Sequence, residues 1–101
     1  MEIVESRSGA QAELFLEGRL DAVSCKDLEQ KFTSCLEAGV VDFTLDLSKL
    51  DYISSAGLRV LLRARKNTAG KNGQIVLRAL NDPVRTVIDL SGLASFFALK
   101  P

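Results

Sequence analysis

Strand-like and helix-like segments alternate along most of the chain, and this alternation limits the possible folds more than any other feature of the sequence. Apolar residues at every second position are typical of a β-strand, whereas apolar residues three and four positions apart indicate an amphipathic helix. Helices that alternate with strands act as right-handed crossovers and bring the strands together as parallel neighbours. The sequence therefore predicts one α/β domain over residues 1–101, with a mixed central sheet and the element order β-β-α-β-α-β-α-β.

The periodicity of each segment gives the approximate position of every element. Strands are predicted at 3–5, 12–17, 43–47, 74–78 and 95–99, and helices within 21–39, 55–72 and 83–91. A turn is predicted between the strand that ends at residue 47 and the second helix. The residues predicted to face the core from the three helices are Cys25, Leu28, Phe32, Cys35 and Leu36, then Leu58, Leu61, Leu62 and Ala69, then Val84, Val87 and Ile88.

Residues that favour helix ends set the boundaries of these helices. Asp21 or Ser24 is predicted to cap the first helix, and Gly39 to end it. For the third helix, Asp82 is the predicted N-cap and Pro83 the first helical residue, a position at which proline loses no hydrogen bond.

The charge balance excludes several classes of partner. Lysine and arginine together number 13, as do aspartate and glutamate, so the formal net charge is zero. A chain without net charge has no overall field that attracts nucleic acid or a membrane surface. No apolar run approaches the ~20 residues of a membrane span, and the start of the chain does not resemble a signal peptide. We expect a cytoplasmic protein that neither binds nucleic acid nor inserts into a membrane.

The sequence offers little for metal binding or catalysis. Histidine is absent, which removes histidine-dependent catalytic triads and the commonest zinc ligand. Cys25 and Cys35 fall in one predicted helix about 15 Å apart, too far for a disulfide, and they lack metal-site spacing. A serine-nucleophile enzyme would rest on two adjacent serines alone. We therefore expect no cofactor, no metal and no enzyme activity, with both cysteines reduced and partly buried.

Those two adjacent serines, Ser54 and Ser55, stand at the predicted start of the second helix. The first backbone N–H groups of a helix have no partner within the helix, and the N-terminus carries roughly half a unit of positive charge. A serine at this position can cap the helix, and a phosphate on it would be tolerated. The residues alone leave both roles open for this pair.

The segment YISSAGL at 52–58, together with DLS at 46–48 and GRLD at 18–21, resembles the STAS domain, the fold of bacterial anti-sigma factor antagonists. The resemblance covers nearly the whole chain and includes NDPV at 81–84 and DLSGL at 89–93. It implies that Ser55 is the phosphate acceptor of a kinase that is also an anti-sigma factor, and that a serine phosphatase removes the phosphate. The family pattern has aspartate where this chain has Ser54 and glycine where it has Arg59. Ser54 is therefore the predicted cap and the less favoured acceptor.

The resemblance implies a regulator that switches between partners. The unphosphorylated form would bind a serine-kinase anti-sigma factor and release the sigma factor, and phosphorylation at Ser55 would reverse this. The partner-binding residues implied by the resemblance and the basic residues beside them are Asp21, Ser54, Ser55, Gly57, Arg59 and Arg63. Asp21 either neighbours the serines or only caps the first helix. The alternative function is that of a STAS accessory subunit of a lipid or solute transport complex that works without phosphorylation.

Basic residues follow the serines along the second helix. Arg59 lies four positions after Ser55, and Arg63 and Lys66 continue on the same side. This basic stripe would steer an acidic partner, or Arg59 would pair with a phosphate on Ser55, or the stripe is an ordinary solvated surface. Arg65 falls on the apolar side, where we expect its stem to lie along the core and its guanidinium to reach water, without a functional role.

Members of the STAS family commonly carry another helix after the last strand, and this sequence has no counterpart of it. We therefore expect the last strand to be less covered, with Phe96 and Phe97 partly exposed. An exposed apolar edge of this kind favours self-association, so the predicted oligomeric state is a monomer or a weak dimer.

Overall fold

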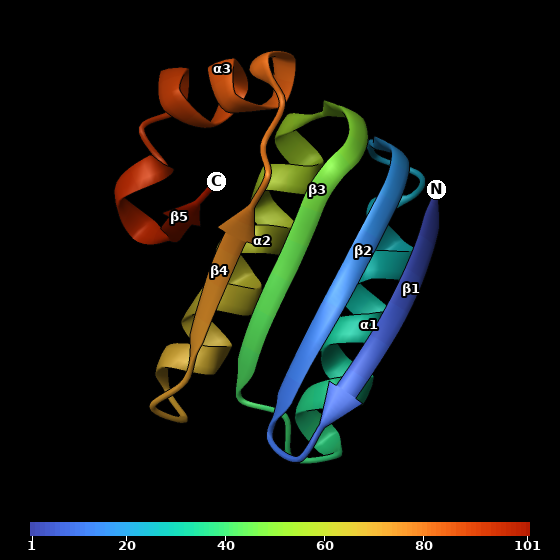
Figure 1. The fold of residues 1–101 in the computed structure, drawn as a ribbon, viewed down its shortest axis with the longest axis vertical. Helices are drawn as coiled ribbons and strands as arrows, with labels where there is room; N and C mark the ends of the chain where they lie inside the picture. The colour runs from blue at the N-terminus through green and yellow to red at the C-terminus, as the bar shows by residue number, and fades with distance from the viewer.

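A five-stranded sheet forms the centre of the molecule in the computed structural model, which describes residues 1–101 (Figure 1). The strands lie in the spatial order β1-β2-β3-β4-β5, with β1 and β2 antiparallel and every other neighbouring pair parallel. The elements are β1 (Glu2–Ser8), β2 (Gln11–Leu20), α1 (Cys25–Glu37), β3 (Asp42–Ile53), α2 (Ser55–Ala69), β4 (Gln74–Arg78), α3 (Asp82–Leu90), a 3-10 turn (Ala94–Phe96) and β5 (Ala98–Lys100). The predicted element order and the mixed sheet are confirmed.

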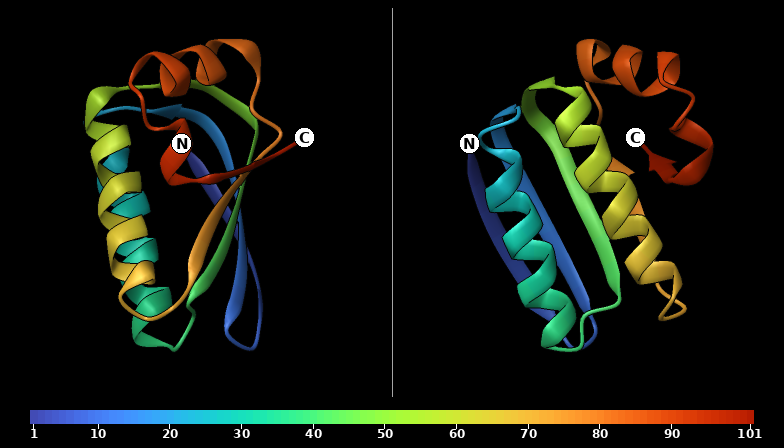
Figure 2. Two further views of the ribbon diagram at one scale, coloured as in Figure 1. Left: turned by 90° about the vertical axis from the view of Figure 1, so that its left-hand side faces the viewer. Right: turned by 180° about the vertical axis from the view of Figure 1, so that it is seen from behind.

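The two long helices, α1 and α2, lie on the same face of the sheet (Figure 2). Each of them connects a strand to its immediate neighbour, and both crossovers advance across the sheet in the same direction. Because such crossovers are right-handed, successive ones that advance in one direction place their helices on one face. The helix α3 lies at one end of the sheet, beyond the carboxyl ends of β3 and β4 (Figure 1). The opposite face of the sheet is left without a helix.

The core fills the space between the sheet and this helical layer. It is a cluster of 23 buried residues, in which Phe32 of α1 packs edge-on against Phe43 of β3 with ring centroids 5.0 Å apart. Both cysteines are buried and free, as predicted, and burial raises the pKa of the Cys35 thiol. None of the helices is long and apolar enough to cross a membrane.

The strand β3 is much longer than predicted and continues to Ile53 without the expected turn. Its pairing with β2 shifts register twice, and at each shift β3 contains one more residue than β2. These are two β-bulges. They explain why the alternation of buried residues changes after Leu47 to a spacing of three, at Leu50 and Ile53. The sequence pattern looked like the end of a strand because an extra residue interrupts the period of two.

Several predicted helix boundaries and helix faces were wrong in detail. Asn81, not Asp82, caps α3, since its side chain accepts a hydrogen bond from the Val84 N–H at 3.1 Å. In α2, Leu58 and Leu61 are buried as predicted, but Ala69 is exposed. The buried positions that the prediction did not include are Gly57, Val60, Ala64 and Thr68. The prediction counted apolar residues and so missed the buried Thr68, whose hydroxyl donates to the Arg65 carbonyl at 2.9 Å.

The last strand is also shorter and later than predicted, because the 3-10 turn occupies its expected start. Phe96 is 45% exposed as expected, but Phe97 is buried in the core at 7% exposure. Arg65 contacts this segment: its Nε donates to the Phe96 carbonyl at 3.0 Å, and its guanidinium lies 5.2 Å from the centre of the Phe96 ring. Arg65 therefore has a structural role, which the sequence analysis did not assign to it.

Candidate functional site at the start of α2

The start of α2 places the two serines in different environments. Ser54 has an extended backbone, and its hydroxyl accepts a hydrogen bond from the Gly57 N–H at 3.2 Å, so it is the N-cap. Ser55 is the first helical residue; its side chain is exposed, and its hydroxyl makes no hydrogen bond within the chain. The first turn of α2 contains no acidic residue that would repel an anion there. One hydroxyl thus stabilises the helix end while the other remains free.

The end of β2 holds this helix start in place. The Ser54 N–H donates to the Leu20 carbonyl at 2.9 Å, which connects the last residue of β2 to the cap. Gly57 packs directly on the same residue: a Cβ at position 57 would lie 2.8 Å from Leu20 Cγ, closer than real contacts allow. Gly57 is therefore required for close packing between α2 and β2. The structure gives it a role behind the surface, where the sequence analysis had counted it among the partner-binding residues.

Asp21 follows Leu20 and belongs to the turn that leads into α1. Its carboxylate accepts hydrogen bonds from the N–H groups of Val23 at 3.0 Å and Ser24 at 2.9 Å. Hydrogen bonds from the backbone and then the side chain of Ser24 lower the pKa of Asp21. Ser24 is the N-cap residue of α1, as one of the two predictions had it, but its side chain makes no capping bond and its hydroxyl donates to the Arg19 carbonyl at 2.6 Å instead. Asp21 is thus beside the serine site through Leu20, and its side chain organises its own loop.

The basic residues on α2 are not equivalent. Arg59 is exposed and forms no ion pair within the chain, and the same is true of Lys66. Arg63 is paired with Glu29 of α1, across the groove between the two helices. The predicted basic stripe is therefore interrupted in the middle, and Arg59 is the free positive charge nearest the serines in sequence.

The sequence did not predict several exposed apolar residues, of which three lie near the ends of β2, β3 and α3. Val23 in the turn after β2 is 82% exposed, Tyr52 near the end of β3 is 39% exposed, and Leu90 at the end of α3 is 84% exposed. The guanidinium of Arg19 covers the Tyr52 ring at 4.2 Å from its centre. Tyr52 lies only two residues before Ser54, but the bulges in β3 conceal from the sequence which way its side chain points. No cluster of three or more potential ligands capable of holding a metal ion is present.

A comparison with protein-family models identifies the relationship. The model described as "Mlab, STAS domain" matches residues 3–99, which is nearly the entire chain. The chain belongs to the STAS domain family. This confirms the resemblance predicted from the GRLD, DLS and YISSAGL segments.

Named STAS relatives and solved structures agree with this assignment. BtrV of Bordetella bronchiseptica, a protein named as an anti-sigma factor antagonist, is 39% identical over 82 residues, covering 81% of this chain and 71% of BtrV. A Thermotoga maritima structure described as an anti-sigma factor antagonist superposes with a TM-score of 0.91 at 19% identity, covering 98% of this chain and 86% of that one.

The anti-sigma factor antagonist SpoIIAA in its unphosphorylated form gives a TM-score of 0.87 at 18% identity over 97% of this chain and 87% of its own. The phosphorylated form of SpoIIAA, described as a Bacillus cell fate determinant, gives 0.77 at 17% identity over 97% of this chain and 90% of its own. At these identities the solved structures establish the STAS fold.

Proposed function

We propose that this protein is an anti-sigma factor antagonist that acts in a partner switch controlled by phosphorylation of Ser55. In this proposal the unphosphorylated form binds a serine-kinase anti-sigma factor and thereby releases a sigma factor. Phosphorylation of Ser55 ends that complex, and a serine phosphatase regenerates the binding form. The protein itself performs no chemistry in this cycle.

The observation that carries the proposal is the free hydroxyl of Ser55 at the start of α2, in a chain 39% identical to a named anti-sigma factor antagonist. Ser54 is less suited as the acceptor because its hydroxyl is already used to cap the helix. A kinase that modified Ser54 would have to break that bond, whereas modification of Ser55 leaves the cap intact. The geometry thus favours the residue that the family pattern also indicates.

The physical effect of the phosphate would be exerted on the partner and not on the fold. A phosphate adds about −1.5 to −2 charge, and the partial positive charge at a helix N-terminus makes this favourable or neutral for the folded state. When the phosphate is buried in the interface with a partner, it loses its hydration and is repelled by negative charges of the partner. A change from 99:1 bound to 1:99 requires about 5.5 kcal/mol, which one buried dianion can approach.

The test is phosphorylation by the serine-kinase anti-sigma factor of the same organism in the presence of ATP. Mass spectrometry should find one phosphate, on Ser55, and the Ser55→Ala variant should accept none. Ser55→Ala should still bind the kinase, whereas Ser55→Asp should bind more weakly. A phosphate on Ser54, or no phosphate under conditions in which another antagonist is modified, would contradict the proposal.

The alternative, a STAS accessory subunit of a transport complex, is supported by one observation on this chain. Ser54 occupies the position at which the family's phosphorylation pattern has aspartate, so the charge beside the acceptor is missing. Under this alternative the protein binds its partner through the same surface but carries no phosphate. Copurification with transporter subunits, together with unmodified Ser55 in protein isolated from cells, would favour it over the partner switch.

A further inference from the structure

No helix covers the face of the sheet opposite α1 and α2 (Figure 2). The pairing register aligns Val4, Phe15, Asp46, Arg78 and Lys100 across all five strands. Their neighbours along the strands, such as Leu14 and Leu16, point into the core. These five residues therefore belong to the face that no helix covers.

The charged side chains at the centre of this face form ion pairs with one another. Arg78 bridges Glu13 at 3.0 Å and Asp46 at 3.1 Å, and its guanidinium lies 5.8 Å from the centre of the Phe15 ring. Burial acts to raise the pKa of Asp46, but hydrogen bonds from Ser48 and Arg78 outweigh it and lower the pKa below its usual value. The charges in this region are already paired within the chain and offer little to a partner.

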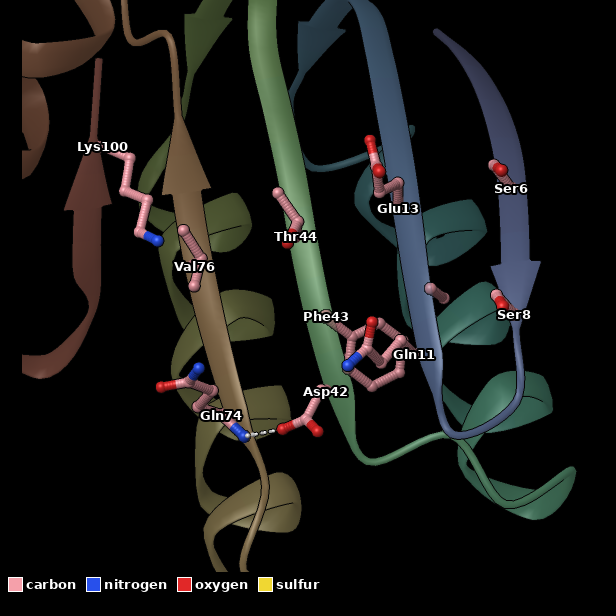
Figure 3. Close-up of a pocket in the computed structure, with 11 residues that line it drawn as sticks. Ser6, Ser8, Gln11, Glu13, Asp42, Phe43, Thr44, Gln74, Val76 and Lys100 are labelled. Carbon is pink, nitrogen blue, oxygen red and sulfur yellow. Dashed lines mark hydrogen bonds between the residues drawn. The ribbon is translucent and has the colours of Figure 1, made fainter.

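The half of the face near the start of β2 and β3 is a shallow polar hollow (Figure 3). Gln11, Glu13, Thr44 and Gln74 line it, with a volume of about 280 Å³. Asp42 at its edge accepts a hydrogen bond from the Gln74 N–H at 3.2 Å. The hollow presents no exposed large apolar side chain, so it lacks the features of a docking site.

The corner formed by the first half of β1 and the second half of β2 is different. Val4 is 59% and Phe15 38% exposed, and they lie directly opposite each other. Beside them Glu2 and Glu17 are also directly opposite each other, and neither forms an ion pair. Lys49 of β3 lies opposite Glu17 on its other side, and both glutamates are exposed, so their carboxylates are open to a partner.

A cavity of about 340 Å³ lies over this corner. Its lining includes Val4 and Phe15 as apolar residues, three carboxylates from Glu2, Glu17 and Asp46, and a single amine from Lys49. Asp46 is already paired with Arg78, so the charges left free in the lining are the carboxylates of Glu2 and Glu17 and the amine of Lys49. We call the residues of this lining the β1–β2 corner.

We propose that the β1–β2 corner docks a polypeptide segment that presents an arginine next to an aliphatic side chain. A guanidinium can bridge the free carboxylates of Glu2 and Glu17, and an aliphatic neighbour covers Val4 and the exposed part of Phe15. Nucleic acid and anionic membranes are repelled by the same carboxylates. A symmetric contact with a second copy would bring Glu2 and Glu17 of both copies together, so a different, basic partner is the better fit.

This docking surface is separate from the start of α2 and does not rest on the proposed function. The corner lies on the open face, whereas α2 packs on the covered one (Figure 2). A partner that engages Ser55 and a second partner at the β1–β2 corner can thus be bound at the same time. The protein would then bridge these two partners, whereas in a simple switch it would release one partner before binding the other.

The experiment titrates the isotopically labelled full chain with the peptide acetyl-Leu-Arg-Val-Arg-Leu-amide and follows backbone amide shifts by NMR. Shifts are expected at residues 2–4 and 15–17 and should be absent with a control peptide that has glutamine in place of both arginines. The Glu2→Gln/Glu17→Gln variant should bind about tenfold more weakly. A matched variant, Glu37→Gln/Asp51→Asn, removes the same charge from two exposed residues elsewhere and should bind as the parent does.

Several results would overturn the proposal. Shifts spread over every acidic region, or the same loss of affinity in both double variants, would show a nonspecific charge effect. Equal binding of the glutamine peptide would exclude recognition of arginine, and no shift at the corner would exclude binding of this kind of segment. Light scattering that shows a dimer, lost on Glu2→Gln/Glu17→Gln substitution, would assign the corner to a second copy instead.

Discussion

Replacing Ser54 and Ser55 one at a time with alanine separates the two roles that adjacent hydroxyls have at the start of α2. Ser54 Oγ accepts the Gly57 N–H, so Ser54→Ala leaves one backbone donor of the first turn without its partner. Ser55 has an exposed side chain and no hydrogen bond to lose. The two variants delete the same chemical group from neighbouring positions, and each is therefore the control for the other.

The expected sizes follow from the geometry. Loss of a serine N-cap costs about 0.5–2 kcal/mol of unfolding free energy, and the 3.2 Å bond is at the long end for N–H···O. We therefore expect about 0.5–1 kcal/mol for Ser54→Ala. Ser55→Ala should change the unfolding free energy by less than about 0.5 kcal/mol, because it is an exposed helical position at which alanine is favoured. For a domain of this size, the Ser54→Ala change corresponds to a fall in Tm of about 2–5 °C.

Urea unfolding followed by circular dichroism measures this difference directly. The midpoint should fall for Ser54→Ala at an unchanged m-value, and Ser55→Ala should unfold with the parent. If Ser55→Ala destabilised the chain as much as Ser54→Ala, both hydroxyls would be structural and the assignment of a free acceptor would be wrong. If Ser54→Ala had no effect, the capping bond would not exist in solution.

Three further changes test other parts of the structure. Because the pKa of Asp46 is lowered in the folded state, its ionised carboxylate stabilises the folded protein fully above the ordinary pKa of 3.8, and this stabilisation is lost as the pH falls through the folded-state pKa. The urea midpoint of Asp46→Asn should therefore depend less on pH in this acid range than that of the parent. Gly73→Ala would place a Cβ 1.8 Å from the Val41 carbonyl oxygen, so the backbone must move; we expect a loss of about 1–3 kcal/mol, and parental stability would show that this turn is placed wrongly. Arg65→Gln removes the guanidinium from the Phe96 ring and should speed amide hydrogen exchange in residues 94–100 while leaving β1 and β2 protected, and unchanged exchange there would refute the role given to Arg65.

Much of the fold was predictable because it depends on local pattern. Clear periodicity gave the order of elements and the mixed sheet. Serine's preference for the N-cap position showed that one of the two serines could cap α2, and the family resemblance assigned that role to Ser54. The errors occurred where tertiary packing determines the outcome. The strand β3 continues through two bulges that only its pairing with β2 defines, and Thr68 is buried although its type does not suggest it.

For the site, the residue types alone pointed to a helix start with two hydroxyls and to nearby basic residues. They did not show that Arg63 is paired with Glu29, because these two residues lie 34 positions apart in sequence and on different helices. Nor did they show why residue 57 is glycine, since the reason is the distance to Leu20 on another element. Such contacts depend on the tertiary fold, which brings together residues that are far apart in sequence.

The class of the protein follows from the sequence alone, because its alternating elements and the segments that resemble the STAS family are properties of neighbouring residues. The tertiary structure decided which hydroxyl is free, which arginine is unpaired and which face of the sheet is open. These properties depend on which residues that are remote in sequence come together, and the right-handed crossovers determine this by placing α1 and α2 on one face of the sheet. The same winding that buries one face of the sheet under α1 and α2 leaves the β1–β2 corner exposed to solvent.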